Sequence, residues 1–464
     1  MGVGDARPAS RLTRRPQYLP GWLAGEPARA WLAAFMAAWP QPVYLVGGSV
    51  RDALLGRDTM DLDFAVDGSA LGLARALADR AGGALVVMDA ERDVARVVMG
   101  RGDQAQHWDL AGLRASTIEA DLRARDLTIN AMALAMRPPH ALLDPTGGCD
   151  DLTRGLLRCA GESAFSDDPV RVLRLARFRC ELGLPVLPAT RRLAAQAVPL
   201  LAESSPERLR DELFAILRLD RAAMALGYLA RLGALAPALC LAQEQAKASL
   251  GGGLGRLRAL EDWAGDRICD GAVEGAMHGA RHAVCGTGRL LLQDWERVLA
   301  GGRTRCQAAK LAALMAALGS QVAEAVCLAL RLGSAEVRWV RGAVAGSEAL
   351  ATGLDGDGDV ALYRYYRRYG EAGVDGAVLS LVGEDQSRAA EALMAWFQRR
   401  AQVVEPPRLV DGRDVMRVWG AGSGPAVGRA LEAIREAQVA GEMASREEAL
   451  RWLDRRALGD NPAR

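Results

Sequence analysis

The sequence predicts an α+β protein in which a head with a small mixed sheet precedes a long all-helical part. Short valine-rich runs bounded by Gly, Asp and Arg, which are typical of strands, are confined to residues 43–136. After about residue 150 nearly every segment has helical periodicity, and Gly-rich breaks at 249–255 and 353–359 separate groups of helices. Aromatic residues make up only 5% of the chain, and abundant alanine and leucine favour helices.

The expected elements follow one another along the head. A loose arm of residues 1–26 precedes a helix at 27–39, which has a proline in its first turn. Strands are expected in VYLVGG, LDFAV, ALVVMD and ARVVMG, with HWDLAGL as a further candidate, and head helices at 49–56, 69–81 and 117–136. Later helices are expected at 169–182, 190–202, 206–218 and 221–232, and so on to 446–457. The predicted domains are a head (27–140), a helical neck (141–220), a helical body (221–400) and a helical tail (401–464).

The bulk composition excludes several classes of protein. Half of the 464 residues are hydrophobic and a quarter are charged, as in globular proteins. The net charge of +1 leaves a nucleic-acid partner open, because a basic stripe can be hidden in a balanced total. No apolar run approaches the roughly 20 residues of a membrane span, and the eight cysteines include no CxxC pair. We expect a cytoplasmic protein with no membrane association, and nothing implies a protein partner.

Two carboxylates on one expected strand indicate a metal site. Side chains at positions i and i+2 of a strand point to the same face, so Asp61 and Asp63 should lie together. Two such like charges repel unless a cation lies between them. Mg²⁺ suits this arrangement, because it binds one or two carboxylates together with substrate phosphates. A solvated edge strand is the alternative.

A glycine turn just before this pair indicates a phosphate site. Gly47, Gly48 and Ser49 come where an apolar run ends and a helix begins, with Arg51 in the first helical turn. Glycines let the backbone approach a ligand closely, and the N–H groups of a helix start attract anions. Together with the acidic pair, the turn indicates a nucleoside triphosphate and a metal in one site.

The pattern GGxxRDxLLGRxxxDxDFxV closely resembles the first motif of the class II tRNA nucleotidyltransferases and bacterial poly(A) polymerases. This family is a branch of the DNA-polymerase-β-like superfamily, so the resemblance implies a polymerase-β-like nucleotidyltransferase head. It also implies that Asp61 and Asp63 hold two Mg²⁺ ions and that the glycine turn holds the triphosphate. The segment HWDLAGLR is similar to the strand that carries a third acidic group, which indicates Asp109.

Two further motifs of the family concern the nucleotide. DLRARDLTINAMAL resembles the second motif and implies sugar contacts by Arg125, Asp126 and Asn130, although Ala124 replaces the first of two usual arginines. The alternative for Asp126 is a helix cap.

The stretch FSDDPVRVLRLARFRCELG resembles the element with which the family reads cytosine and adenine. A helical wheel places Asp167, Arg171 and Arg174 in about one 60° sector. Asp168 and Arg171, three residues apart, can present an acceptor beside a fork of donors. A surface ion pair is the alternative.

Toward its C-terminus the chain resembles the tRNA-directed members. There the turn at Gly424, with Gly428 after it, opens a helix whose N–H groups could meet an RNA phosphate, although a plain helical hairpin is the alternative. No histidine is followed by Asp, so we expect no phosphohydrolase activity of the His-Asp type.

The resemblance predicts an enzyme that completes the 3′ end of tRNA with C and/or A residues from CTP and ATP. The chain after Arg114 runs almost directly into the second motif, without the flexible loop of many CCA-adding relatives, which leaves CC addition or A addition open. Three alternatives are a poly(A) polymerase, a small-molecule nucleotidyltransferase of the antibiotic-modifying kind, and a non-catalytic RNA-binding protein. The absence of a strongly basic C-terminal tail argues against the first, because non-specific tracking along RNA depends on neutralising phosphates.

Overall fold

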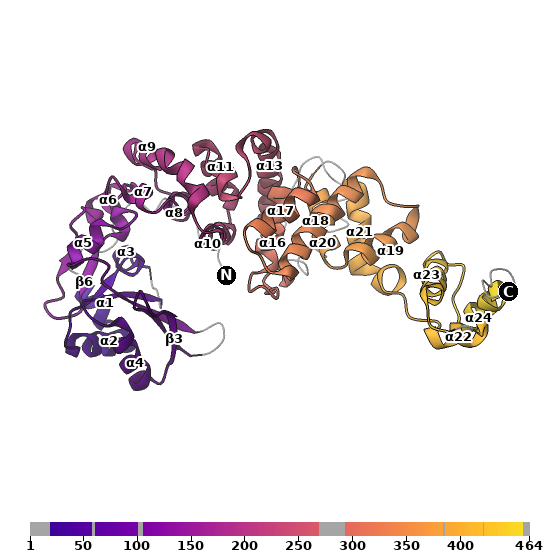
Figure 1. Ribbon diagram of the computed structural model, residues 1–464, viewed down its shortest axis with the longest axis horizontal. Helices are drawn as coiled ribbons and strands as arrows, with labels where there is room; N and C mark the ends of the chain where they lie inside the picture. The colour runs from indigo at the N-terminus through magenta and orange to yellow at the C-terminus, as the bar shows by residue number, and fades with distance from the viewer. Residues whose placement is uncertain are drawn as a thin grey trace. The chain divides into compact units, whose positions relative to one another are not determined.

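The computed structural model describes residues 19–57, 61–100, 105–268, 293–383, 386–420 and 422–457. The chain divides into two compact units, and Figure 1 shows its course by residue number. Unit 1 consists of Met1–Glu212 and Met224–Ala238, and unit 2 consists of Leu213–Ala223 and Leu239–Arg464. The α+β class is confirmed, because the described strands of the sheet all lie in the head of unit 1 and helices follow it.

The head is built on a seven-stranded mixed sheet. Its order is β3-β4-β5-β2-β1-β6-β7, and only β2 and β5 pair in parallel. The strands are β1 (Val43–Val46), β2 (Leu62–Val66), β3 (Ala84–Asp89), β4 (Val94–Met99), β5 (Gln106–Gly112), β6 (Ala133–Ala135) and β7 (Leu142–Leu143). The central strands are apolar on their covered face, where Leu45, Phe64 and Leu110 are almost fully buried. The four expected strands and the further candidate HWDLAGL correspond to β1–β5 and are confirmed.

Helices surround and follow this sheet. The head and neck contain α1 (Leu19–Ala24), α2 (Pro27–Ala38), α3 (Gly48–Leu54), α4 (Ala70–Ala81), α5 (Ile118–Arg123), the 3₁₀ helix η3 (Thr128–Asn130), α6 (Gly148–Arg154), α7 (Ala164–Asp167), α8 (Arg171–Leu182), α9 (Pro188–Ala197), η4 (Val198–Glu203), α10 (Pro206–Leu217), α11 (Ala222–Leu232) and α12 (Leu235–Ala238). Helix α4 packs against β4 and β5, with Leu73 and Leu77 fully buried. The expected loose arm is wrong at its end, because α1 buries Leu19 and Trp22; residues 1–18 of the arm lie outside the described residues.

One expected helix, at 117–136, is wrong over most of its length. Helix α5 ends at Arg123, and the chain then forms η3 and strand β6. Buried polar bonds hold this irregular segment: the Thr128 hydroxyl donates to Asp151 at 2.6 Å, and the backbone N–H of Thr128 donates to the carbonyl of Arg158. These non-local bonds outweigh a helical propensity that is only a weak preference.

The remaining described part of unit 2 is mainly helical. It contains α13 (Gln243–Ile268), α16 (Arg305–Met315), α17 (Ser320–Ala329), α18 (Ser334–Thr352), α19 (Gly358–Tyr369), α20 (Ala372–Leu381), α21 (Gln386–Gln398), the π-helix η5 (Arg400–Val404), α22 (Gly412–Trp419), α23 (Pro425–Val439) and α24 (Arg446–Ala457). The last three helices enclose a core of their own around Val415, Ile434 and Leu453. In the part of the chain that the structure describes, no helix combines the length and the apolar character needed to cross a bilayer.

Candidate active site

The glycine turn joins β1 to α3 and lies against the second motif. Gly47 has φ of +70°, and a Cβ atom there would lie 3.1 Å from Nη1 of Arg125. Only glycine meets both requirements without strain. The hydroxyl of Ser49 accepts a hydrogen bond from the backbone N–H of Asp63 at 3.0 Å and lies 3.5 Å from the carbonyl oxygen of Asp61. The turn is thus fastened to the start of the acidic strand.

Three charged side chains form a row across neighbouring strands. Asp63 on β2 is the register partner of Asp109 on β5, and Asp109 is the register partner of Arg96 on β4. Arg96 donates to both carboxylate oxygens of Asp109, at 2.7 and 2.8 Å. Since paired residues of adjacent strands project from the same face, the two carboxylates lie side by side. The structure therefore brings together Asp63 and the third acidic residue predicted from the sequence.

This row perturbs the ionisation of Asp63. Its side chain reaches solvent, yet protein atoms surround it on most sides, and this burial raises its pKa to about 6. The negative charge of Asp109 raises the pKa further, whereas the charges of Arg125, Arg174 and Arg96 lower it. A carboxylate held against a like charge and facing three cationic groups is typical of a site that binds both a metal and an anion.

Asp61 lies just outside strand β2, which begins at Leu62. One oxygen of the Asp61 carboxylate accepts a hydrogen bond from the backbone N–H of His107 at 2.9 Å, at the beginning of β5. The side chain is 69% exposed, so it is open to a ligand. Its charge also acts on Arg96, which places it beside the row. A shared role with Asp63 stays a prediction.

The side chain of Arg51 is buried next to the glycine turn and is bonded to other side chains. Its guanidinium donates to both oxygens of Asp52 and, from Nη1, to Oδ1 of Asn130 at 2.7 Å. Only 4% of the residue is exposed. The amide of Asn130 in turn faces Asp126, with Nδ2 3.4 Å from Oδ1. Direct contact of Arg51 or Asn130 with a nucleotide stays a prediction; what the structure shows is their bond to each other.

Asp126 connects the head to the neck helix α8. Its Oδ2 accepts from Nε of Arg174 at 2.8 Å, and Arg174 also donates to Glu212 of α10 at 3.2 Å. Burial opposes the charged form of Asp126, but the charge and hydrogen bonds of Arg174 and neighbouring donors outweigh it and lower the pKa. Arg125 is held beside the turn by a 3.2 Å ion pair with Asp121. Arg174 of α8 thus joins Asp126 of the second motif, a link that the sequence did not predict.

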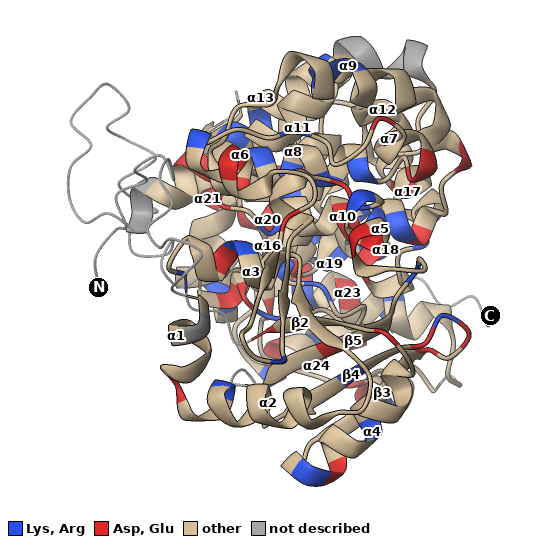
Figure 2. Ribbon diagram, turned by 90° about the vertical axis from the view of Figure 1, so that its left-hand side faces the viewer, with Lys and Arg blue, Asp and Glu red and all other residues tan. Residues whose placement is uncertain are grey.

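The predicted sector of Asp167, Arg171 and Arg174 on a single helix is wrong. Asp167 ends the short helix α7, and its carboxylate accepts from the Ser163 hydroxyl at 2.6 Å. The backbone of Asp168 is extended, with φ of −149°, because the residue before a proline avoids helical conformations. Helix α8, whose arginines are blue in Figure 2, starts only at Arg171.

The pair of Asp168 and Arg171 does form. Their side chains lie 3.5 Å apart, and Arg208 of α10 donates to the same oxygen of Asp168 at 2.6 Å. The other oxygen of Asp168 is buried and accepts no hydrogen bond from the described residues. An acceptor without a partner beside a guanidinium can bind the edge of a base.

Two further residues belong to the site and were not predicted from the sequence, Arg96 and Phe178. Arg96 is the lone charge within the apolar run of β4, and this break in the pattern was a usable signal. Phe178 of α8 is buried, with the guanidinium carbons of Arg51, Arg174 and Arg177 lying 5.2, 5.4 and 4.5 Å from its ring centre. No local pattern reveals this convergence, because Arg51 comes from another element.

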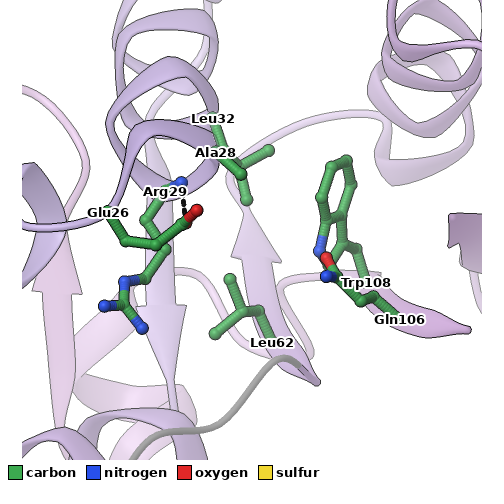
Figure 3. Close-up of a pocket in the computed structure, with 7 residues that line it drawn as sticks. All are labelled: Glu26, Ala28, Arg29, Leu32, Leu62, Gln106 and Trp108. Atoms are coloured by element: carbon green, nitrogen blue, oxygen red, sulfur yellow. Dashed lines mark hydrogen bonds between the residues drawn. The ribbon is translucent and has the colours of Figure 1, made fainter. Parts of the chain in front are cut away.

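A small pocket lies behind the acidic row (Figure 3). It is lined by Leu62 and Trp108, by Gln106, and by Glu26, Ala28, Arg29 and Leu32 at the start of α2. Leu62 and Trp108 are register partners and directly precede Asp63 and Asp109, so their side chains point to the opposite face of the sheet. The pocket is therefore not the space into which the acidic row opens.

The site suits a hard divalent cation that is shared with substrate phosphates. Asp63 and Asp109 offer adjacent carboxylate oxygens, and Asp61 is open to solvent beside them. Within the described ranges, no group of three or more His, Cys, Asp or Glu side chains is arranged to hold a metal alone. Mg²⁺ fits, because it binds through one or two carboxylates and takes its remaining ligands from water and phosphates.

The two tail glycines lie at the start of α23. Gly424 precedes the helix and Pro425 is its first residue, as expected. Gly424 and Gly428 are both exposed, and a Cβ atom at either position would meet no other atom within 4 Å. They leave the beginning of this 15-residue helix accessible.

The sequence is similar to known proteins over most of its length. Residues 43–158 match the model of the poly A polymerase head domain, and residues 183–243 match that of a probable RNA and SrmB-binding site of polymerase A. A CC-adding tRNA nucleotidyltransferase of Geobacter sulfurreducens is 32% identical over 89% of this chain and 92% of its own length. An A-adding tRNA nucleotidyltransferase of Deinococcus radiodurans is 33% identical over 90% and 96%.

The chain belongs to the tRNA nucleotidyltransferase family. It is therefore an enzyme, and the family resemblance inferred from its motifs is confirmed. Solved structures of CCA-adding enzymes have a similar fold. A CCA-adding enzyme in complex with CTP aligns with a TM-score of 0.68 and 23% identity, covering 95% of this chain and 98% of that one. The CCA-adding enzyme of Thermotoga maritima in complex with tRNA aligns with a TM-score of 0.61 and 24% identity, covering 92% and 95%.

Proposed function

We propose that this nucleotidyltransferase adds C and/or A residues to the 3′ end of tRNA, with CTP and ATP as donors and Mg²⁺ as cofactor. The observation that carries the proposal is the pair of adjacent carboxylates, Asp63 and Asp109, facing Arg125 and Arg174 beside a glycine turn. Negative groups for a metal and positive groups for an anion thus converge on one strand end. The curated relatives support tRNA as the substrate.

Each part of the site has a task in this reaction. In this proposal the backbone of Gly47 and Gly48 receives the triphosphate, and Ser49, whose buried hydroxyl accepts from the backbone N–H of Asp63, supports the turn. Mg²⁺ held by Asp61, Asp63 and Asp109 would lower the pKa of the RNA 3′-hydroxyl and offset charge on the pyrophosphate. The protein positions the reactants and needs no nucleophilic side chain, because phosphoryl transfer depends mainly on alignment and charge.

The neck supplies base recognition in this proposal. Asp168 presents a buried oxygen without a partner, and Arg171 presents donors 3.5 Å from the carboxylate. The sugar of the incoming nucleotide is assigned to Asp126 with Arg125 and Arg174, and the bond from Arg174 to Asp126 supports this grouping. Asp167 is less suited to base recognition, because its carboxylate already accepts a hydrogen bond from the Ser163 hydroxyl.

The functional division of the chain is also a proposal. The head (27–140) carries the chemistry, the neck (141–220) reads the base, and the tail (401–464) binds tRNA, with the helical body (221–400) between neck and tail in the sequence. Within the tail, the start of α23 at Gly424 and Gly428 is accessible to an RNA phosphate.

The added nucleotides can be determined with three tRNA substrates that end before CCA, after CC and after CCA. Each is incubated with CTP, ATP or both. Addition of CC alone, of A alone or of CCA identifies the partial or complete activity. No incorporation on any of the three substrates would refute the tRNA proposal. Relatives named CC-adding and A-adding match this chain at nearly the same identity. Identity therefore does not predict which nucleotides are added, and the assay includes all three substrates.

A poly(A) polymerase is the second candidate, because the head matches the poly A polymerase model over residues 43–158. It would extend an unstructured RNA with many residues from ATP alone. The same assay with such an RNA separates the two activities. The double variant Asp61→Ala with Asp63→Ala tests catalysis itself, because it abolishes either activity and leaves a merely RNA-binding protein functional.

A further inference from the structure

Two arginines lie over the ring of one buried tyrosine in unit 1, and the charge of a third acts on it. Tyr228 of α11 is 6% exposed, and the guanidinium carbons of Arg179 and Arg231 lie 5.0 and 5.9 Å from its ring centre. Arg179 comes from α8 and Arg231 from α11, and Arg191 of α9 is close enough for its charge to act on the same side chain. Figure 1 shows these helices in one part of the molecule.

These cations lack the counter-charges that the other arginines of α8 have. Arg171, Arg174 and Arg177 each form an ion pair with an acidic side chain. In the described part of the chain, Arg179, Arg191 and Arg231 have no acidic side chain within ion-pair distance. Three like charges gathered without a counter-ion repel one another, and such a cluster is favourable once an anion joins it.

The tyrosine hydroxyl is a second, independent sign of a ligand. It is buried and has no hydrogen-bond partner among the described residues. Buried hydroxyl groups normally have a partner, and losing one costs free energy. An oxygen acceptor that reached this hydroxyl would supply its missing partner.

We infer that Tyr228, Arg179, Arg191 and Arg231 form a binding site for a phosphate of the tRNA backbone, separate from the acidic row. Arginine forks bind phosphate oxygens through two parallel hydrogen bonds, and a phosphate has enough acceptor oxygens for several such donors. The site contributes affinity without reading sequence, as phosphate contacts do. The inference rests on the proposed function, and it assigns residues within and next to the segment that matches the RNA-binding model.

The test measures binding of a fluorescently labelled tRNA to the full-length protein over a series of salt concentrations. The variants are Arg179→Gln, Arg191→Gln, Arg231→Gln and Tyr228→Phe. Arg192→Gln is the matched control, because Arg192 is an exposed neighbour on α9 whose charge is not among those acting on Tyr228. Thermal unfolding of each variant verifies that it is folded.

We expect each arginine substitution to weaken binding about tenfold, the effect of losing one charged hydrogen bond. Each should also lower the slope of log affinity against log salt by about 0.9 if one phosphate contact is lost. Tyr228→Phe should weaken binding by a smaller factor with an unchanged slope. The Arg192→Gln control should match the wild type.

Binding and salt slopes equal to wild type in all three arginine variants would overturn the inference, and so would an equal loss in Arg192→Gln. Nucleotide incorporation by the wild-type enzyme on the same tRNA is measured in parallel. If the wild type binds and extends tRNA while the variants bind normally, the inference alone fails. If the wild type neither binds nor extends tRNA, the proposed function fails.

Discussion

Phe178 provides a test of how the neck holds the site together. Its ring is 5% exposed and lies beneath three guanidinium groups, of which Arg51 braces the glycine turn and Arg174 holds Asp126. Substitution of Phe178 by leucine keeps an apolar side chain but removes the π face. We therefore expect it to loosen both the glycine turn and the segment around Asp126.

The magnitude follows from the burial of the three cations. Arg51 is 5% exposed at its side chain, so its cation–π contact is desolvated and contributes about 2 kcal/mol. Arg174 and Arg177, at 34% and 19%, contribute about 0.5–1 kcal/mol each. Phe178→Leu should thus cost about 3–4 kcal/mol beyond the loss of packing. For a folding unit of this size, that lowers its Tm by roughly 6–16 °C, at about 2–4 °C for each kcal/mol.

The assay compares Phe178→Leu with Phe165→Leu, a matched control. Phe165 is 1% exposed, and no described arginine lies over its ring. Both variants lose the same packing volume, so the difference in Tm isolates the cation–π contacts. We also expect a raised KM for CTP and ATP in Phe178→Leu only, and recovery of most of both properties in Phe178→Tyr. Equal Tm values for the two leucine variants, with an unchanged KM, would refute the reasoning.

Three further predictions concern the charged groups. Asp63→Asn should abolish incorporation yet raise the Tm of metal-free protein at neutral pH, because the raised pKa of Asp63 means that its ionised form destabilises the fold. This gain should shrink as the pH falls below about 6 and vanish near the ordinary carboxyl pKa of 3.8, as thermal unfolding at several pH values will show. Arg96→Gln removes a cation that competes with Mg²⁺ for Asp109. In a thermal-shift titration, the Mg²⁺ concentration that gives half of the maximal stabilisation should therefore be several-fold lower than for the wild type. An unchanged Mg²⁺ concentration would contradict this. Arg174→Met leaves buried Asp126 unpaired and should cost about 3–5 kcal/mol of stability. Because the pKa of Asp126 is lowered in the wild type, this deficit should shrink at acidic pH, and a deficit independent of pH would argue against the pairing.

Local pattern was enough to find the strands, the glycine turn and the candidate carboxylates. Valine-rich runs with polar boundaries predict strands because the alternation of side chains between two faces is a local property. The turn at Gly47 and the acidic residues Asp61 and Asp63 stand within 17 residues of one another, so spacing alone relates them. The link of Asp109 to this pair came from family resemblance, since sequence distance hides it.

Tertiary structure decided which charges meet. The register of β2, β5 and β4 places Asp63, Asp109 and Arg96 in one row, and strand pairing is not encoded in any single segment. Likewise, the expected helix at 117–136 gave way to buried bonds from Asp151 and Arg158, which lie outside it. Pro169 was a usable sequence signal that Asp167 and Arg171 do not lie on one helix, because the residue before a proline avoids helical conformations. A sequence specifies such partners only through the folded chain, because the energy of a buried charge depends on neighbours that are distant along it.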